Sequence, residues 1–134
     1  MIKIIFSLIF ICFSFCYKAD FSDKIDVYRN GKLIHSTEKF KGDFLFTNLF
    51  NIGDTITFHA ETDWDELFNA TIDVKSTEGI LYKTLNRVKN NVYGAQFQLI
   101  ITEQLLMEEF ELTLNYITKS KIEPWTFFIM KKDE

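Results

Sequence analysis

Alternation of apolar and polar residues is the feature that most restricts how this chain of 134 residues can fold. The pattern runs through four segments: 55–61, 69–75, 95–102 and 110–116. In the first of them, Ile56, Phe58 and Ala60 are separated by single polar residues. Successive side chains of a β-strand point to opposite faces, so this period predicts strands that bury one face and expose the other.

The pair Asn30-Gly31 carries the strongest turn signal in the chain. It separates the segments 25–29 and 32–36, both of which have strand-forming residues. Asn followed by Gly suits the two positive-φ positions of a type I′ turn, so these segments are predicted to form a β-hairpin.

The remaining segments complete an all-β pattern. Further strands are predicted at 43–46, 80–85 and 125–130, and a turn at 76–79 makes 80–85 the hairpin partner of the strand before it. Residues 103–109 are rich in helix-forming types but too few for an independent helix, so a helical turn is expected there.

About eight short strands with no helices between them predict a single domain at residues 17–134. The expected fold is an antiparallel β-sandwich with immunoglobulin-like or fibronectin-III-like layering. The composition suits a packed core, because 47% of residues are apolar, 25% are charged, and the chain has only five Gly and one Pro. These proportions exclude a disordered or low-complexity chain.

Residues 1–16 have the pattern of a secretory signal peptide. Lys3 supplies a positive charge, and the apolar stretch at 4–13 is shorter than the roughly 20 residues that span a bilayer. We expect cleavage after Cys16, which leaves a chain that starts at Tyr17. The protein is then exported, with a secreted, periplasmic or cell-surface location.

Cys16 also allows a second interpretation of the same segment. It stands where a bacterial lipoprotein carries its lipid, although Phe15 is larger than the usual residue before that cysteine. Lipidation of Cys16 is the one way in which we expect the protein to contact a membrane. The other cysteine, Cys12, also lies in this segment, so no disulfide is expected in the exported domain.

Charge and residue types argue against several classes of function. The formal net charge is −4, and removal of residues 1–16 takes away Lys3 and changes it to −5, so a nucleic-acid binder is not expected. The two histidines, His35 and His59, are predicted to face outward from strands, and Ser36 with His59 lacks the local pattern of a catalytic triad. We therefore expect no enzyme, no metal site and no cofactor.

The segment 61–66 is the least ordinary part of the chain, and within it Asp63, Trp64, Asp65 and Glu66 are the predicted binding residues. Clustered carboxylates can hold Ca²⁺, but the spacing is not that of an EF-hand. The indole of Trp64 can stack on a sugar ring while its acidic neighbours bind the hydroxyls. A solvated acidic turn, with Trp64 packed into the core, explains the same residues without a ligand.

Three functions follow from these observations. The first is a non-enzymatic binding or accessory module that recognises a protein or carbohydrate ligand through loops at the ends of the sandwich. The alternative is a small acidic inhibitor or immunity protein that binds a basic toxin or cell-wall hydrolase. The third, ranked last, is a glycoside hydrolase that acts through two carboxylates of the loop from Asp63 to Glu66. A separate interface is possible where Ile100, Phe128 and Met130 are predicted to face outward.

Overall fold

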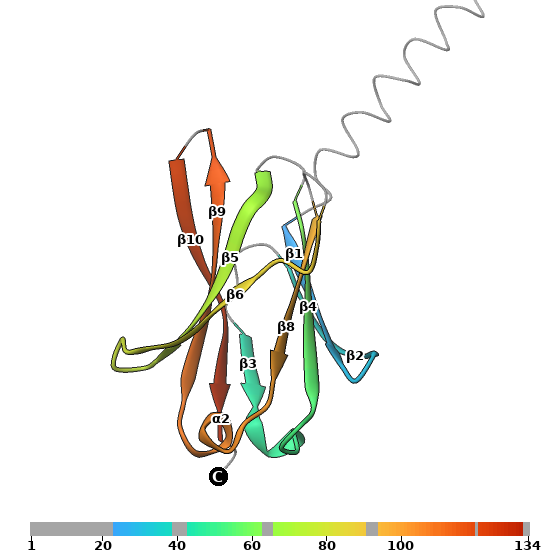
Figure 1. Ribbon diagram of the computed structural model, residues 1–134, viewed down its shortest axis with the longest axis vertical. Helices are drawn as coiled ribbons and strands as arrows, with labels where there is room; N and C mark the ends of the chain where they lie inside the picture. The colour runs from blue at the N-terminus through green and yellow to red at the C-terminus, as the bar shows by residue number, and fades with distance from the viewer. Residues whose placement is uncertain (1–22, 39–42, 63–65, 91–93, 120, 133–134) are drawn as a thin grey trace, which may run out of the picture.

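The computed structural model describes residues 23–38, 43–62, 66–90, 94–119 and 121–132. Within these residues, two sheets of five strands each pack face to face (Figure 1). The strands are β1 (Lys24–Arg29), β2 (Lys32–Glu38), β3 (Asp43–Phe46), β4 (Thr55–Glu61), β5 (Glu66–Ser76), β6 (Leu81–Asn86), β7 (Lys89–Asn90), β8 (Gly94–Ile100), β9 (Phe110–Thr118) and β10 (Lys121–Lys131). The prediction of an all-β, sandwich-like fold is confirmed.

The order of the strands defines the two layers. Sheet 1 has the order β2-β1-β4-β8-β7, and sheet 2 has the order β3-β10-β9-β5-β6. Neighbouring strands run antiparallel except β3, which pairs parallel with β10. The sequence did not predict this parallel pair. β2 lies in sheet 1 and β3 lies in sheet 2, so the chain changes sheets between these two strands. β3 then lies along the edge of β10 and runs in the same direction as β10.

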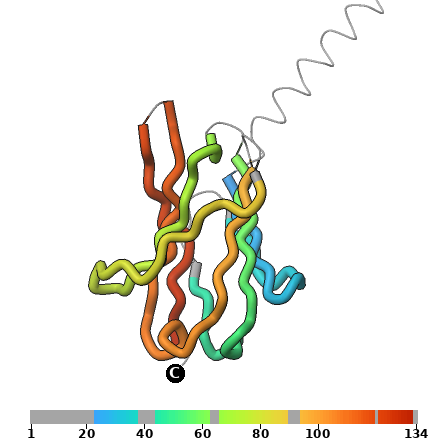
Figure 2. Tube along the Cα trace, viewed as in Figure 1, coloured from blue at the N-terminus to red at the C-terminus, as the bar shows by residue number. Residues whose placement is uncertain are grey.

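Two short helical segments lie at one end of the sandwich. They are η1 (Thr47–Leu49), which follows β3, and α2 (Glu103–Met107), which connects β8 to β9. Figure 2 shows both at the end opposite the tips of β9 and β10. The helical turn predicted at 103–109 is confirmed. We call this end of the molecule the helical end.

The core lies between the sheets and is filled by the residues that alternation marks as inward. Ile56, Phe58 and Ala60 on β4 are at most 1% exposed. Rings from the facing sheet meet them, since the centroid of Phe58 lies 5.6 Å from that of Phe127 and 6.4 Å from that of Phe128. Burial of such side chains is the main favourable contribution to folding.

The hairpin predicted at Asn30-Gly31 forms, but its second strand is irregular. Asn30 and Gly31 have φ values of 48° and 85°, as a type I′ turn requires. Val27 then pairs with His35 and Tyr28 with Leu33, which leaves one extra residue on β2. This bulge turns His35 toward the interior, where its ring lies 5.2 Å from that of Phe128. The prediction that His35 faces outward is therefore wrong.

A second bulge changes the orientation of the last strand. Thr126 pairs with Thr113 and Phe128 with Leu112, so Phe127 is the extra residue on β10. Phe127, Phe128 and Met130 are all 0% exposed. The prediction that Phe128 and Met130 face outward is wrong because the bulge reverses the alternation after Phe127.

Candidate functional site

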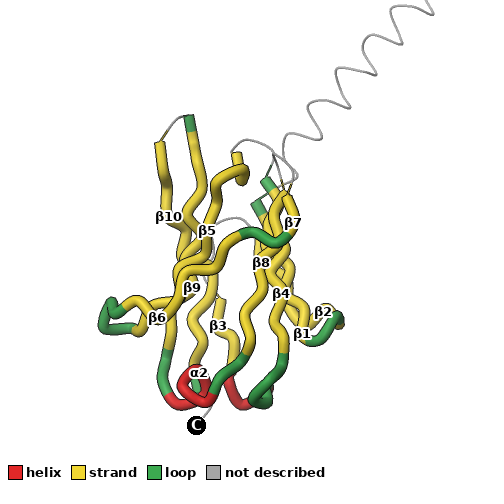
Figure 3. The backbone as a smooth tube through the Cα atoms, viewed as in Figure 1, coloured by secondary structure: helices red, strands yellow, loops and turns green. Residues whose placement is uncertain are grey.

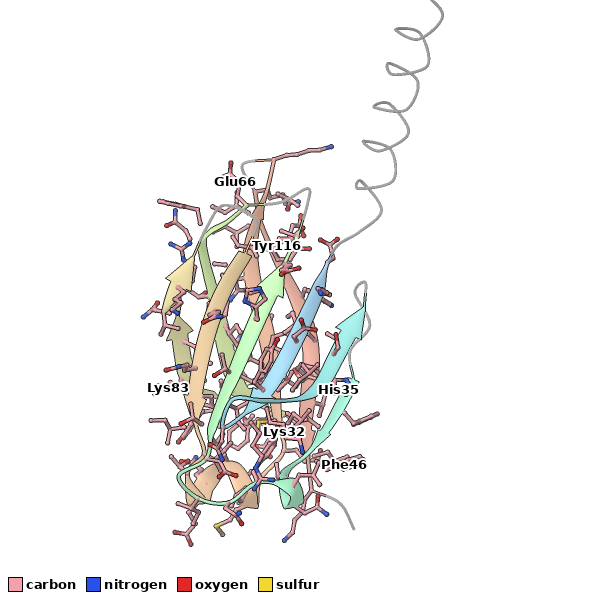
Figure 4. The ribbon with its side chains drawn as sticks, turned by 90° about the vertical axis from the view of Figure 1, so that its right-hand side faces the viewer. Lys32, His35, Phe46, Glu66, Lys83 and Tyr116 are labelled. Carbon is pink, nitrogen blue, oxygen red and sulfur yellow. The ribbon has the colours of Figure 1, made fainter. Side chains whose placement is uncertain are left out.

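The binding segment predicted from the sequence is described only at its last residue. Asp63, Trp64 and Asp65 lie outside the described residues, as do Cys16 and the whole of residues 1–16. Glu66 begins β5 and is exposed, at the end of the sandwich opposite the helical end (Figure 4). The predicted binding residues and the possible lipidation of Cys16 therefore stay predictions.

The interior beside the end of β4 and the start of β5 is closely packed. Tyr116 and Trp125 are each 7% exposed, and a small hollow beside them has a volume of about 10 Å³. The hydroxyl of Thr62 donates a hydrogen bond to the carboxylate of Asp23 at the same hollow. A space of this size holds one water molecule at most, so the hollow is too small for a larger ligand.

The arrangement of Ser36 and His59 differs from that of a hydrolase. The hydroxyl of Ser36 donates to Asp26 at 2.5 Å, while Nε2 of His59 lies 3.0 Å from Oε1 of Glu61. A triad needs the imidazole between the hydroxyl and the carboxylate, so that the imidazole can take the hydroxyl proton. Here the hydroxyl binds a carboxylate directly, and the imidazole faces a different one.

A hollow much larger than the one beside Tyr116 and Trp125 lies near the helical end. It has a volume of about 480 Å³ and separates the turn between β5 and β6 from α2 and the start of β9. Figure 3 shows this turn in green and α2 in red in the lower half of the molecule. We call this hollow the turn–helix groove.

Two aromatic rings form the fixed inner surface of the turn–helix groove. Tyr82 on β6 and Phe110 on β9 line it, and their ring centroids are 5.4 Å apart. The hydroxyl of Tyr82 makes a 2.7 Å hydrogen bond with the hydroxyl of Thr102, the residue before α2. These contacts tie β6 to the start of α2, so the groove exists before any partner arrives.

The rim of the turn–helix groove combines carboxylates with exposed apolar side chains. Glu78 on the turn and Glu108 and Glu109 after α2 are exposed, and none of the three forms an ion pair with another described residue. Ile80 and Leu81 are 66% and 53% exposed. Among the described lining residues there is no Lys, Arg or His, so the groove presents negative charge beside apolar surface.

The turn itself is held by its own hydrogen bonds. The amide of Gly79 donates to the carbonyl of Ser76 at 2.9 Å, and the amide of Ser76 donates to the carbonyl of Ile80 at 2.8 Å. The hydroxyl of Ser76 accepts a further bond from the amide of Ile80 at 3.1 Å. These bonds fix the position of Ile80 and of the neighbouring rim.

A second exposed apolar surface lies on β3. Phe44 and Phe46 are 56% and 39% exposed, and Nζ of Lys131 lies 5.7 Å from the ring centroid of Phe44. Figure 4 labels Phe46 at the side of the molecule.

The pKa of Asp54 lies below its usual value of 3.8. The backbone amide of Asn51 has the largest effect, and the side chains of Asn30 and Arg29 add to it against a smaller opposing effect of burial. The two side chains donate to the carboxylate at 3.0 Å and 2.8 Å. The carboxylate of Asp54 therefore has a structural role, because both of its oxygens accept hydrogen bonds from residues of the same fold.

Within the described part of the chain, no three His, Cys, Asp or Glu side chains gather as a metal site would require. No helix there is long and apolar enough to cross a membrane.

Sequence reasoning missed the turn–helix groove, although two local signals mark its walls. Ile80 and Leu81 are consecutive apolar residues directly after a turn, and Glu108 and Glu109 are consecutive acids directly before a strand. Neither pair indicates a site until the fold brings them together. Comparison of the chain with protein-family models, curated proteins and solved structures found no match.

Proposed function

We propose that this protein is an exported, non-enzymatic β-sandwich that binds a partner at one end of the sandwich. The observation that carries the proposal is the turn–helix groove, which has a volume of about 480 Å³. Ligand-binding hollows commonly have volumes of about 300–1,000 Å³. Contacts between Tyr82, Phe110 and Thr102 hold the groove in shape, which reduces the entropy lost on binding.

The strand order supports immunoglobulin-like layering. The series β1-β4-β8-β7 matches the order A-B-E-D of an immunoglobulin sheet, and β10-β9-β5-β6 matches G-F-C-C′. On this assignment β2 and β3 are additional strands at the edges. Domains of this type use rigid strands to present end loops for recognition, and we assign the same use to this protein.

The roles of the two histidines support a non-enzymatic protein. His35 packs against Phe128, and His59 faces Glu61 on the outer surface of sheet 1. The glycoside-hydrolase hypothesis for the loop at 63–66 stays a prediction, because Asp63 and Asp65 lie outside the described residues.

The acidic rim of the groove supports the alternative function, a small exported inhibitor or immunity protein. Glu78, Glu108 and Glu109 would face the basic surface of a toxin or cell-wall hydrolase. This alternative requires binding that weakens as salt concentration rises and that reduces the activity of the bound protein. A binding module without inhibitory action would leave that activity unchanged.

Export is part of the proposal, and lipidation of Cys16 is its anchored form. The described chain begins at Asp23, beside β1 and at the end opposite the helical end, and Cys16 lies outside the described residues. Intact mass of the soluble and membrane fractions distinguishes a chain that starts at Tyr17 from one that starts at a lipidated Cys16.

Site-specific photo-crosslinking in the native host tests the binding function. The photoreactive residue p-benzoylphenylalanine would replace Leu81 in the groove, Trp64 in the predicted loop, or Ile122 as a control. Ile122 is 70% exposed and lies on β10 near the other end. We expect one defined protein adduct from position 81 and none from position 122. Absence of an adduct at all three positions would contradict the binding function, and an adduct from position 64 alone would assign binding to the predicted loop.

A further inference from the structure

The lining of the turn–helix groove indicates the chemistry of its occupant. We propose that the groove binds an extended, positively charged segment of a partner protein, in which an apolar side chain is flanked by Lys or Arg. The inference deepens the proposed binding function and depends on it. The charge and the apolar surface of the groove indicate which kind of partner segment would bind there.

The carboxylates on both walls of the groove are complementary to a positively charged segment. Glu78 approaches the groove from the turn, while Glu108 and Glu109 approach it from the opposite wall. A cation between the walls would meet carboxylates on both sides, and no described residue now pairs with them. Carboxylates around a partly enclosed, low-dielectric groove raise the local concentration of cations more than the same carboxylates on a flat surface would.

The exposed apolar side chains of the groove favour a partner segment that also contains an apolar residue. Ile80 and Leu81 are 66% and 53% exposed at the groove, above the rings of Tyr82 and Phe110. A purely ionic ligand would leave this apolar surface in water. An apolar side chain between two cations would cover it, which adds contact area to the ionic attraction.

The position of β6 favours an extended segment. β6 is the last strand of sheet 2, and among the described strands it pairs only with β5. Its outer backbone groups therefore lack a strand partner beside the groove, and extended peptides bind such edges by main-chain hydrogen bonds. Lys83, which is exposed on the same strand (Figure 4), would repel cations and restrict the segment to the part of β6 nearest the turn.

Fluorescence anisotropy with two labelled peptides tests the inference on the purified protein. The probe is acetyl-Lys-Leu-Lys-Leu-Lys-amide, and the control peptide has Glu in place of each Lys. The groove variant is Glu108→Gln with Glu109→Gln. Its matched control is Glu61→Gln with Glu123→Gln, which removes the same charge from residues outside the groove. A third variant, Leu81→Ser, removes apolar surface, and thermal unfolding checks that every variant is folded.

We expect the Lys peptide to bind and the Glu peptide not to bind. The groove variant and Leu81→Ser should each weaken binding by about tenfold, and the matched control by less than about twofold. Equal weakening by the two double variants would show general attraction to an acidic protein and would overturn the inference. Failure of the Lys peptide to bind the folded wild-type protein would overturn it as well.

The crosslinking experiment separates this inference from the proposed function. If position 81 crosslinks to a partner but the protein does not bind the Lys peptide, the proposed binding function is supported. The inference that the partner segment is basic is then wrong. Failure of both experiments would reject both proposals.

Discussion

The carboxylate of Asp54 connects the β1–β2 hairpin to the segment just before β4. It accepts hydrogen bonds from Nε of Arg29 at 2.8 Å, from Nδ2 of Asn30 at 3.0 Å and from the amide of Asn51 at 2.8 Å. Asn30 also accepts a bond from the amide of Thr55 at 2.9 Å. The carboxylate thus fixes the β1–β2 turn to the start of β4.

Replacement of Asp54 by Asn should make stability less dependent on pH in the acid range. The folded-state pKa of Asp54 is lowered, so its contribution is complete above the unfolded-state pKa, about 3.9, and is lost as pH falls through the lower folded-state pKa. Urea unfolding should find the variant less stable than wild type at pH 7, with a smaller difference near pH 2.5. The same difference at both pH values would contradict this role.

Tyr82 provides a second test at the scale of single residues. Tyr82→Phe keeps the ring contact with Phe110 and removes the hydrogen bond to Thr102. The free energy of unfolding should fall by about 0.5–1.5 kcal/mol, and binding of the Lys peptide should weaken because α2 is no longer tied to β6. Tyr28→Phe is the control, since Tyr28 is also half-buried but makes no hydrogen bond through its hydroxyl with described residues. An equal loss in the control would show that the Thr102 bond contributes nothing.

At the scale of the strand, alternation predicted buried faces well wherever pairing is regular. β4 has the expected inward residues at Ile56, Phe58 and Ala60. The errors in orientation, at His35, Phe128 and Met130, all follow a bulge. A bulge shifts the register by one residue, and whether it forms depends on packing against the opposite sheet, which local sequence does not encode.

Alanine substitutions on β10 test the bulge directly. Phe128 is 0% exposed and Ile129 is half-buried on the other face. Phe128→Ala should lower the free energy of unfolding by about 3–5 kcal/mol, as expected for a large core ring, and Ile129→Ala should cost about 1 kcal/mol or less. Uninterrupted alternation from Trp125 would place Ile129 inside, so a larger loss for Ile129→Ala would contradict the bulge.

At the scale of the whole molecule, the sandwich could be predicted but the groove could not. The positions of most strands, the hairpin at Asn30-Gly31 and the helical turn at 103–109 follow from local patterns, whereas the short strand β7 was not predicted. The walls of the groove come from residues 76–82 and 104–110, which meet because β5 pairs with β9, with Ser76 opposite Phe110. This long-range pairing brings Ile80 and Leu81 to the same groove as Glu108 and Glu109. Neither pair indicates a binding site by itself.

The predicted loop and the groove place binding at opposite ends of the sandwich. The sequence favours Trp64 because an indole among carboxylates is unusual, and the structure favours Leu81 because it is 53% exposed beside a groove. Both choices fit an exported binding module. They differ in which single substitution should weaken partner binding.

The most direct measurement is the affinity of the crosslinked partner for wild type, Leu81→Ser and Trp64→Ala, each shown to be folded by thermal unfolding. Binding at the turn–helix groove predicts that Leu81→Ser weakens affinity by about tenfold and that Trp64→Ala changes it by less than about twofold. Weakening by Trp64→Ala with no effect of Leu81→Ser would contradict this account and would place recognition in the loop at 63–66.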